Sequence, residues 1–209
     1  MRRLGWERWG ALAGILYVVL YLVAVALGIE VGASDREIAE YYGDSGHRAK
    51  EIAAFFLIAA AALAFVILTL ALRTLIVRRE GSSPLAALAW AGGLAYAVLL
   101  LAGNAVSRAT AFAAMDDVFT LDPDTRRLAE AAGFLLFVSG ALAAILLVVA
   151  VSLAALRFGI LPRWLGWAGF VVAALLPLAI GFIGFLVLFA WVLAVSVALA
   201  LRRPPSGVL

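Results

Sequence analysis

The chain has 209 residues, of which 67% are hydrophobic and only 14% are charged. A typical soluble domain has about 25% charged residues, so this composition excludes an ordinary water-soluble protein. The net charge is +3, but the basic residues lie in short clusters between apolar runs, which is typical of membrane proteins and argues against a nucleic-acid partner. The absence of cysteine excludes disulfides and thiolate metal sites.

The apolar runs predict one all-α domain, residues 1–209, that forms an integral membrane bundle of six helices. The spans are expected at about 10–28, 52–77, 85–107, 128–156, 164–179 and 182–201. Residues 164–201 carry no charge and would be about 57 Å long as one helix, roughly twice the hydrocarbon thickness of a bilayer. This stretch must therefore cross twice, and Pro177, Gly181 and Gly184 mark where it can turn.

The first span follows Met1, Arg2 and Arg3, so it also has the features of a secretory signal. The residues Ala24, Val25 and Ala26 would permit cleavage. We favour an uncleaved anchor, because an apolar run of about 19 residues is longer than the core of a usual signal peptide.

The arginine distribution predicts that both chain ends are cytoplasmic. With that orientation, ten basic residues lie on the inner side and six on the outer side, together with eleven of the 13 acids. Tryptophans near the inner ends of the spans agree with it: Trp6, Trp9, Trp90, Trp164 and Trp167. We therefore expect a multi-pass protein of the cytoplasmic membrane that contacts lipids. A membrane-protein partner and a homo-oligomer are both compatible with this sequence.

Several local signals predict helix ends. Ser34 and Glu37 have the spacing of a capping box, and Ile38, Tyr41 and Tyr42 share one face, which predicts a short helix over 35–42 on the membrane surface. Later boundaries are expected at Asp122 with Pro123, at Gly159 and at Pro162.

The spans also show a repeated pattern that favours three helical hairpins. Each inward-running span ends with a hydroxyl residue shortly before an arginine, at Thr69, Ser152 and Ser196. Each outward-running span begins with tryptophan and small residues, at Trp9–Gly10, Trp90–Ala91–Gly92 and Trp167–Ala168–Gly169. Common descent of the hairpins explains this pattern, and so does a background rich in alanine and leucine with arginine at every inner helix end.

Polar residues near the outer end of the third span form the main candidate site. Tyr96, Asn104, Ser107, Arg108 and Ala111 lie close to one helical face. At the edge of the hydrocarbon Arg108 needs a carboxylate partner, and the acids expected at that depth are Glu30, Asp116, Asp117 and Glu130. One interpretation is a polar vestibule that opens outward and binds an ion or a polar head group. The structural alternative, which we favour, is a snorkelling arginine and an asparagine that bonds a neighbouring helix.

Other reactive side chains lack the partners that chemistry needs. His47 is the single histidine and lies among scattered acids, so we expect a solvated loop residue and no metal site. Thr69, Ser139, Ser152 and Ser196 have no histidine or lysine placed as a base, and each can bond its own helix one turn back. We expect no catalytic residue and no cofactor. Gly10 and Gly14 form a GxxxG that allows close helix packing.

Three segments carry a resemblance to a known group: 161–167 (LPRWLGW), 191–203 and 35–42 (DREIAEYY). They are similar to small bacterial multi-span membrane proteins of unknown function, of the domain of unknown function 4386 type. The resemblance implies a helical bundle in a bacterial inner membrane, and it implies no activity and no functional residue.

Three functions stay open at this point. The first is a non-catalytic membrane protein that acts through helix or lipid contacts, for example as an accessory subunit. The second is a small transporter or channel with an outward-facing polar site at Asn104 and Arg108. The third, an intramembrane enzyme acting on a lipid, is the least favoured because the sequence shows no acid and base pair.

Overall fold

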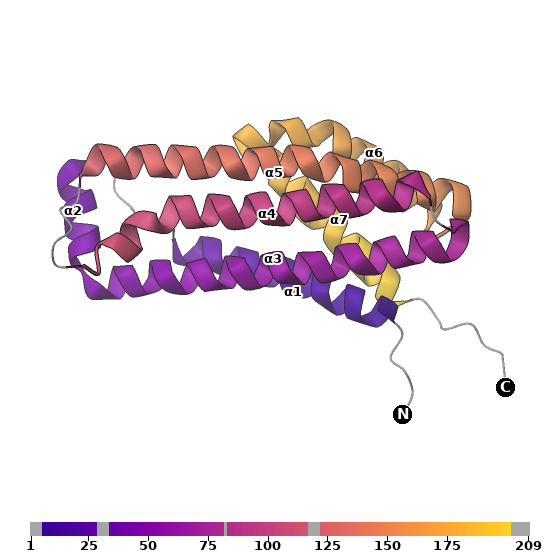
Figure 1. Cartoon of the computed structure of the whole chain (residues 1–209), viewed down its shortest axis with the longest axis horizontal. Helices are drawn as coiled ribbons and strands as arrows, with labels where there is room; N and C mark the ends of the chain where they lie inside the picture. Colours follow the sequence, from indigo (N-terminus) through magenta and orange to yellow (C-terminus); the bar gives the residue numbers. More distant parts are fainter. Residues whose placement is uncertain (1–5, 29–33, 82, 117–121, 202–209) are drawn as a thin grey trace, which may run out of the picture.

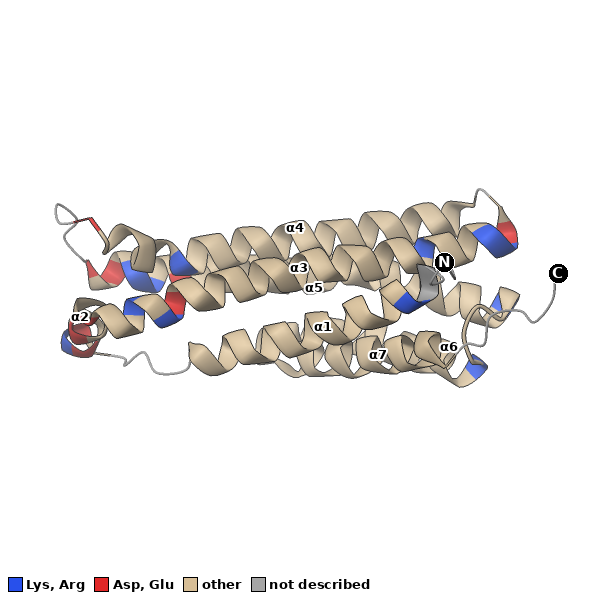
Figure 2. Cartoon of the chain, turned by 90° about the horizontal axis from the view of Figure 1, so that it is seen from below, with Lys and Arg blue, Asp and Glu red and all other residues tan. Residues whose placement is uncertain are grey.

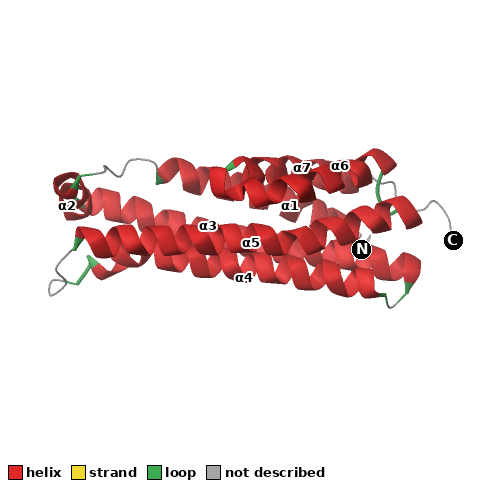
Figure 3. Ribbon diagram, turned by 90° about the horizontal axis from the view of Figure 1, so that it is seen from above, coloured by secondary structure: helices red, strands yellow, loops and turns green. Residues whose placement is uncertain are grey.

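The computed structural model of the protein describes residues 6–28, 34–81, 83–116 and 122–201, and every regular element in these residues is helical (Figure 3). The elements are α1 (Trp6–Leu27), α2 (Asp35–Gly43), α3 (Ser45–Glu80), α4 (Pro84–Ala113), α5 (Pro123–Phe158), α6 (Arg163–Leu175), the 3-10 helix η1 (Leu176–Gly181) and α7 (Ile183–Ala200). All except α2 belong to six segments that are long and apolar enough to cross a membrane, with α6 and η1 forming one segment. The prediction of an all-α, six-span membrane bundle is confirmed.

The start of α1 and the end of α7 lie at the same end of the bundle (Figure 1). We call this the inner end, after its predicted cytoplasmic location. The opposite end, which carries α2, is called the outer end. Lys, Arg, Asp and Glu gather near these two ends and leave the middle of the described helices uncharged (Figure 2).

Three of the helices extend at least five residues further toward the outer end than the spans predicted from the sequence. α3 begins at Ser45 and not at residue 52, α5 begins at Pro123 and not at residue 128, and α4 continues to Ala113 and not to residue 107. With 36 residues, α3 and α5 are each about 54 Å long, whereas the hydrocarbon layer is about 30 Å thick. Their ends therefore project beyond the hydrocarbon into the polar layers.

The caps predicted from the sequence are present. The Ser34 Oγ accepts a hydrogen bond from the Glu37 backbone N–H at 3.3 Å, and the Glu37 carboxylate accepts one from the Ser34 N–H at 3.0 Å. Asp122 accepts from the Thr125 N–H at 3.1 Å, directly before Pro123 opens α5. Gly159 ends α5 with a φ of 61°, a conformation that glycine adopts without steric cost.

The six spans form a closed ring. α1 packs on α3, α3 on α4, α4 on α5, α5 on α6 and α6 on α7, and α7 returns to α1. Consecutive spans run in opposite directions (Figure 1), so the chain consists of three hairpins, α1–α3, α4–α5 and α6–α7. Their common descent remains a hypothesis.

A hydroxyl lies against a glycine wherever one hairpin meets the next. An ideal Cβ placed on any of these glycines would lie under 3.0 Å from the facing hydroxyl oxygen, a separation that real Cβ atoms essentially never show. Only glycine therefore allows the helices to approach this closely. The three pairs are Thr69 of α3 with Gly93 of α4, Ser152 of α5 with Gly169 of α6, and Ser196 of α7 with Gly14 of α1.

The third hairpin is shorter than the other two. α6 has 13 residues and ends in η1, and the chain then turns at Phe182 into the 18 residues of α7. The turn lies where Pro177, Gly181 and Gly184 were expected to allow it, and within it Phe182 is the residue with a positive φ, of 65°. A bulky residue in the left-handed region is unusual and costs about 1–3 kcal/mol.

The contact between Gly14 and Ser196 can be tested with a double-mutant cycle. Gly14→Ala places a methyl group on the Ser196 Oγ, which is also held by its hydrogen bond to the Val192 carbonyl at 2.7 Å. We expect the single variant to lower the free energy of unfolding by about 1–3 kcal/mol, and Gly14→Ala/Ser196→Ala to recover most of that loss. Thermal unfolding in detergent measures both effects.

Gly181→Ala is the matched control, because an ideal Cβ at Gly181 meets no atom within 4 Å. It should leave the melting temperature unchanged. A Gly14→Ala protein as stable as the wild type would contradict the proposed steric basis of the ring.

Candidate functional site

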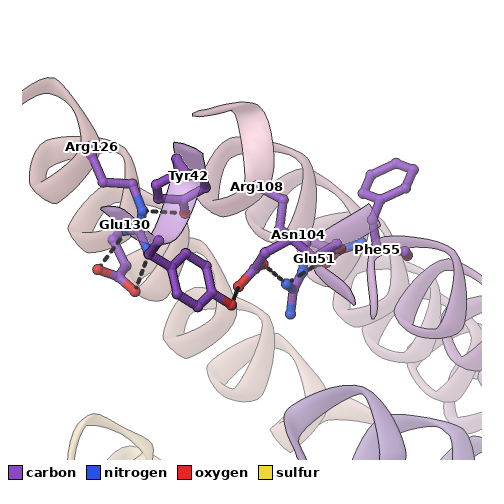
Figure 4. A network of polar contacts seen from close by, with 8 residues as sticks. Tyr42, Glu51, Phe55, Asn104, Arg108, Arg126 and Glu130 are labelled. Carbon is purple, nitrogen blue, oxygen red and sulfur yellow. Dashed lines mark hydrogen bonds and ion pairs between the residues drawn. The ribbon is translucent and has the colours of Figure 1, made fainter. Parts of the chain in front are cut away.

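Arg108 on α4 forms a buried ion pair with Glu51 on α3 (Figure 4). The side chain of Arg108 is 12% exposed and that of Glu51 is 6% exposed. The Arg108 Nε also donates to the Asn104 Oδ1 at 3.1 Å, and the Asn104 Nδ2 donates to the Phe55 carbonyl at 2.9 Å. Asn104 therefore bonds a neighbouring helix, as the structural alternative predicted.

The acid that pairs with Arg108 in the described residues, Glu51, was not among the four named from the sequence. Glu30 and Asp117 lie outside the described residues, Asp116 follows the end of α4, and Glu130 forms an ion pair with Arg126 at 2.6 Å. The actual partner, Glu51, was assigned to the outer loop because the second span was expected to begin one residue later.

A signal in the sequence could have identified Glu51. The buried residues of α3 include Glu51, Ala54, Ile58, Ala61 and Phe65, which recur at intervals of three and four residues. The buried stripe of the helix thus continues outward through Glu51, and extending the helical period would have placed that carboxylate on the interior face.

The ion pair lies about one hydrocarbon thickness away from Arg73 along α3. Glu51 and Arg73 are on the same helix, 22 residues apart, and this corresponds to about 33 Å along α3. That distance is close to the hydrocarbon thickness of about 30 Å. With Arg73 at the inner boundary, the Arg108–Glu51 pair is therefore at the outer boundary.

The apolar face of the short helix α2 packs on protein, whereas its amphipathic pattern suggested that this face lies against the membrane. Ile38, Tyr41 and Tyr42 are buried and form a cluster with Ala111 of α4. The Tyr41 hydroxyl donates to the Glu51 carboxylate at 3.2 Å. Tyr41 thus contacts Glu51 of α3, and Tyr42 contacts Arg126 of α5.

The Tyr42 hydroxyl accepts a hydrogen bond from the Arg126 Nε at 2.6 Å (Figure 4). Burial raises the pKa of Tyr42, and burial together with the nearby Glu51 carboxylate raises the pKa of Tyr41. Both hydroxyls therefore stay protonated at neutral pH, and Tyr41 acts as a donor. The two contacts hold α2 across the outer ends of α3 and α5.

A pocket of about 500 Å³ lies in the outer half of the ring, next to Arg108. Five of the six spans contribute to its wall, and α6 alone among them does not. Asn104 is fully buried and is not among the lining residues. The wall consists of Tyr21, Val25, Ile58, Ser107, Arg108, Arg127, Glu130, Ala131, Phe134, Phe137, Phe182 and Phe185.

The α5 side of this pocket changes from polar to apolar with depth. Arg127 and Glu130 are nearest the outer end, followed by Ala131, Phe134 and Phe137. Their spacing places all five on one face of the helix. From Arg127 to Phe137 this face covers about 15 Å along the helix axis.

Aromatic rings close the pocket toward the inner end. The ring of Phe65 lies 4.9 Å from that of Tyr17 and 4.6 Å from that of Tyr96, and the two tyrosine hydroxyls form a hydrogen bond. All three side chains are fully buried. Each lies further inward on its helix than a lining residue, as Tyr17 does relative to Tyr21 on α1. The pocket thus lies in the outer half of the bundle, on the outer side of these three rings.

Phe182 stands at the rim of the pocket. It combines the positive φ described above with 65% exposure, and its ring lies 5.3 Å from that of Phe134. Strained backbone positions are common at ligand clamps, where the surrounding structure holds them in place. The turn of the short hairpin thus brings an aromatic side chain to the pocket entrance.

The remaining candidate residues make packing contacts and hydrogen bonds within the bundle. His47 stacks on Tyr41 with ring centroids 4.4 Å apart, and the described residues contain no group of acids and histidine that could hold a metal ion. Ser139 and Ser196 donate to carbonyls one turn back, as predicted. Thr69 and Ser152 do not, and each packs on the glycine of a neighbouring helix.

Two further pockets lie along α7, one toward the inner end and one between α6 and α7. Their described lining residues include no charged side chain. Of the three pockets, the outer one is therefore the one whose described lining residues include charged groups that could orient a ligand.

Comparison of the chain with family models, with curated proteins and with solved structures finds no match. The resemblance to the domain of unknown function 4386 type therefore stays a prediction, and the candidate site depends on the geometry described above.

The contribution of the Arg108–Glu51 ion pair to stability can be tested by substitution. Glu51→Gln leaves Arg108 without its carboxylate, and we expect the free energy of unfolding to fall by about 3–5 kcal/mol. Glu51→Gln/Arg108→Gln should lose less, because no unpaired charge then remains buried. Thermal unfolding in detergent compares the two variants.

The exposed pair of Arg36 and Glu40 provides the control. Glu40→Gln should change stability by at most about 1 kcal/mol. If Glu51→Gln were no more harmful than Glu40→Gln, the Arg108–Glu51 pair would not be the structural link described above.

Proposed function

We propose that this multi-pass membrane protein is a non-catalytic, lipid-binding protein of the cytoplasmic membrane, and that its outer pocket holds the head group and upper acyl chain of a lipid. The observation that carries the proposal is the α5 wall, on which Arg127 and Glu130 are followed inward by Ala131, Phe134 and Phe137. A lipid has the same order of polar and apolar groups at the same depth in the bilayer.

The size of the pocket supports the same proposal. A volume of about 500 Å³ lies within the range of roughly 300–1,000 Å³ that is typical of small-molecule sites. The aromatic rim at Phe134 and Phe182 suits an acyl chain, and the hydroxyls of Tyr21 and Ser107 add polar groups near Arg108. A small hydrated ion would leave the apolar part of this pocket unfilled.

The same wall supports binding over catalysis. Among the described lining residues there is neither histidine nor lysine, the usual partners that activate a hydroxyl nucleophile. Both oxygens of Glu130 contact the guanidinium of Arg126, at 2.9 and 2.6 Å. Glu130 is the one carboxylate among the described lining residues, so this wall lacks the pair of acid and base groups that an enzyme acting on the bound lipid would need.

Filling the pocket tests the proposal. Ala131→Trp places an indole in the pocket from an exposed position on α5. We expect the amount of lipid retained through purification in mild detergent to fall about tenfold or more. This is the effect expected when a lipid loses the larger part of its buried contact with the pocket. Native mass spectrometry of the purified protein measures the bound lipid. The melting temperature after delipidation should match that of the wild type.

Leu128→Trp is the matched control, because Leu128 lies one turn away, is 71% exposed and does not line the pocket. It should retain lipid like the wild type. Equal retention in the Ala131→Trp and Leu128→Trp proteins would rule out the outer pocket as the lipid site.

A small transporter with an outward-facing site is the second candidate, and the polar vestibule at Arg108 favours it. For this function the aromatic rings of Tyr17, Phe65 and Tyr96 would have to separate to open a path inward. In proteoliposomes, a transporter should lose solute flux in the Glu51→Gln/Arg108→Gln variant. Flux that is unchanged in this variant would remove the basis for placing a transport site here.

A further inference from the structure

The polar part of the pocket carries charges of both signs. Arg108 of α4 and Arg127 and Glu130 of α5 contribute to the wall. Around them, each cation has an acidic neighbour: Arg108 pairs with Glu51, and Arg127 contacts Asp124 at 2.8 Å and also pairs with Asp35. The cations are thus neutralised locally, and the wall has no excess of positive charge that would select a purely anionic head group.

The guanidinium of Arg108 still has donor capacity toward the pocket. Its Nε donates to Asn104 and its Nη1 to Glu51, whereas its Nη2 makes no hydrogen bond within the described part of the chain. The Nη2 lies near Gly28, just beyond the end of α1. Arginine is well suited to bind the oxygens of a phosphate.

Glu130 supplies the opposite charge on the same wall. Its side chain is 57% exposed, and although both oxygens contact Arg126, a carboxylate has about four lone-pair positions and can accept further hydrogen bonds. The pocket therefore presents guanidinium donors and a carboxylate acceptor to one occupant.

We infer that the occupant is a zwitterionic phospholipid with a primary ammonium in its head group, such as phosphatidylethanolamine. This inference rests on the proposed function. The phosphate lies against Arg108 and Arg127, and the ammonium donates to Glu130. A trimethylammonium head group has no N–H to donate, and a phosphatidylglycerol head group has no cation to pair with Glu130, so both bind less well.

The experiment compares three lipids on the full-length protein. The protein is delipidated and reconstituted in nanodiscs with equal amounts of phosphatidylethanolamine, phosphatidylglycerol and phosphatidylcholine of identical acyl chains. The lipid retained on release into mild detergent is then identified by native mass spectrometry. We expect phosphatidylethanolamine to exceed each competitor by about fivefold, the size of one partly exposed charge-assisted hydrogen bond.

Glu130→Gln should reduce this preference to less than about twofold while total retained lipid stays high, because the arginines and the apolar wall remain. Glu40→Gln is the matched control, since Glu40 is an exposed glutamate of α2 outside the pocket. Soluble phosphoethanolamine, which has the head group without acyl chains, should not displace the lipid. Displacement by it would show that the head group alone is the ligand and would overturn the inference.

The outcomes separate this inference from the proposed function. Equal retention of the three lipids, or a preference for phosphatidylglycerol or phosphatidylcholine, overturns the head-group assignment and leaves lipid binding intact. A preference that persists unchanged in the Glu130→Gln protein also overturns the assignment. Retention of no lipid of any class overturns the proposed function, and this inference with it.

Discussion

The close approach of a hydroxyl residue to a glycine is the constraint on which the rest of the bundle depends. In a bilayer, apolar side chains gain little by leaving lipid for protein, so helices associate through close packing of small residues. Here that packing occurs at each of the three junctions between hairpins, including the one where α7 meets α1. The ring closes because glycine is present at all three junctions.

The ring is packed differently at its two ends because the third hairpin is short. Toward the inner end the spans meet through small residues, and Tyr17, Phe65 and Tyr96 fill the middle. Toward the outer end α6 stops early, and η1 and Phe182 turn the chain back while α3, α4 and α5 continue. The pocket occupies the space that this difference in helix length leaves, and α2 braces the longer helices above it.

Much of this architecture could be predicted from residue types alone. Hydropathy located the spans, and Ser34, Asp122 and Gly159 marked helix ends, because capping is a local property of the backbone. The three hydroxyl residues also emerged as a repeated pattern, and so did Gly169, whereas Gly14 and Gly93 were not part of it. Which glycine meets which hydroxyl depends on how the hairpins pack, and no spacing within one helix contains that information.

The polar site was harder to predict because its contacts join distant parts of the chain. Arg108 was found as a residue in need of a carboxylate, but the choice of Glu51 depends on α3 extending past its apolar stretch. The burial of α2 depends on Ala111 leaving room for two tyrosines. Phe182 had no signal, because a strained backbone conformation at a phenylalanine is imposed by the surrounding fold.

The aromatic barrier formed by Tyr17, Phe65 and Tyr96 gives the molecule a direction. The pocket is confined to the outer side of these rings and does not run through the bundle from one end to the other. With the predicted orientation, the pocket lies in the half of the bundle that faces away from the cytoplasm. Under the proposed function, the bound lipid would therefore come from the monolayer on that side.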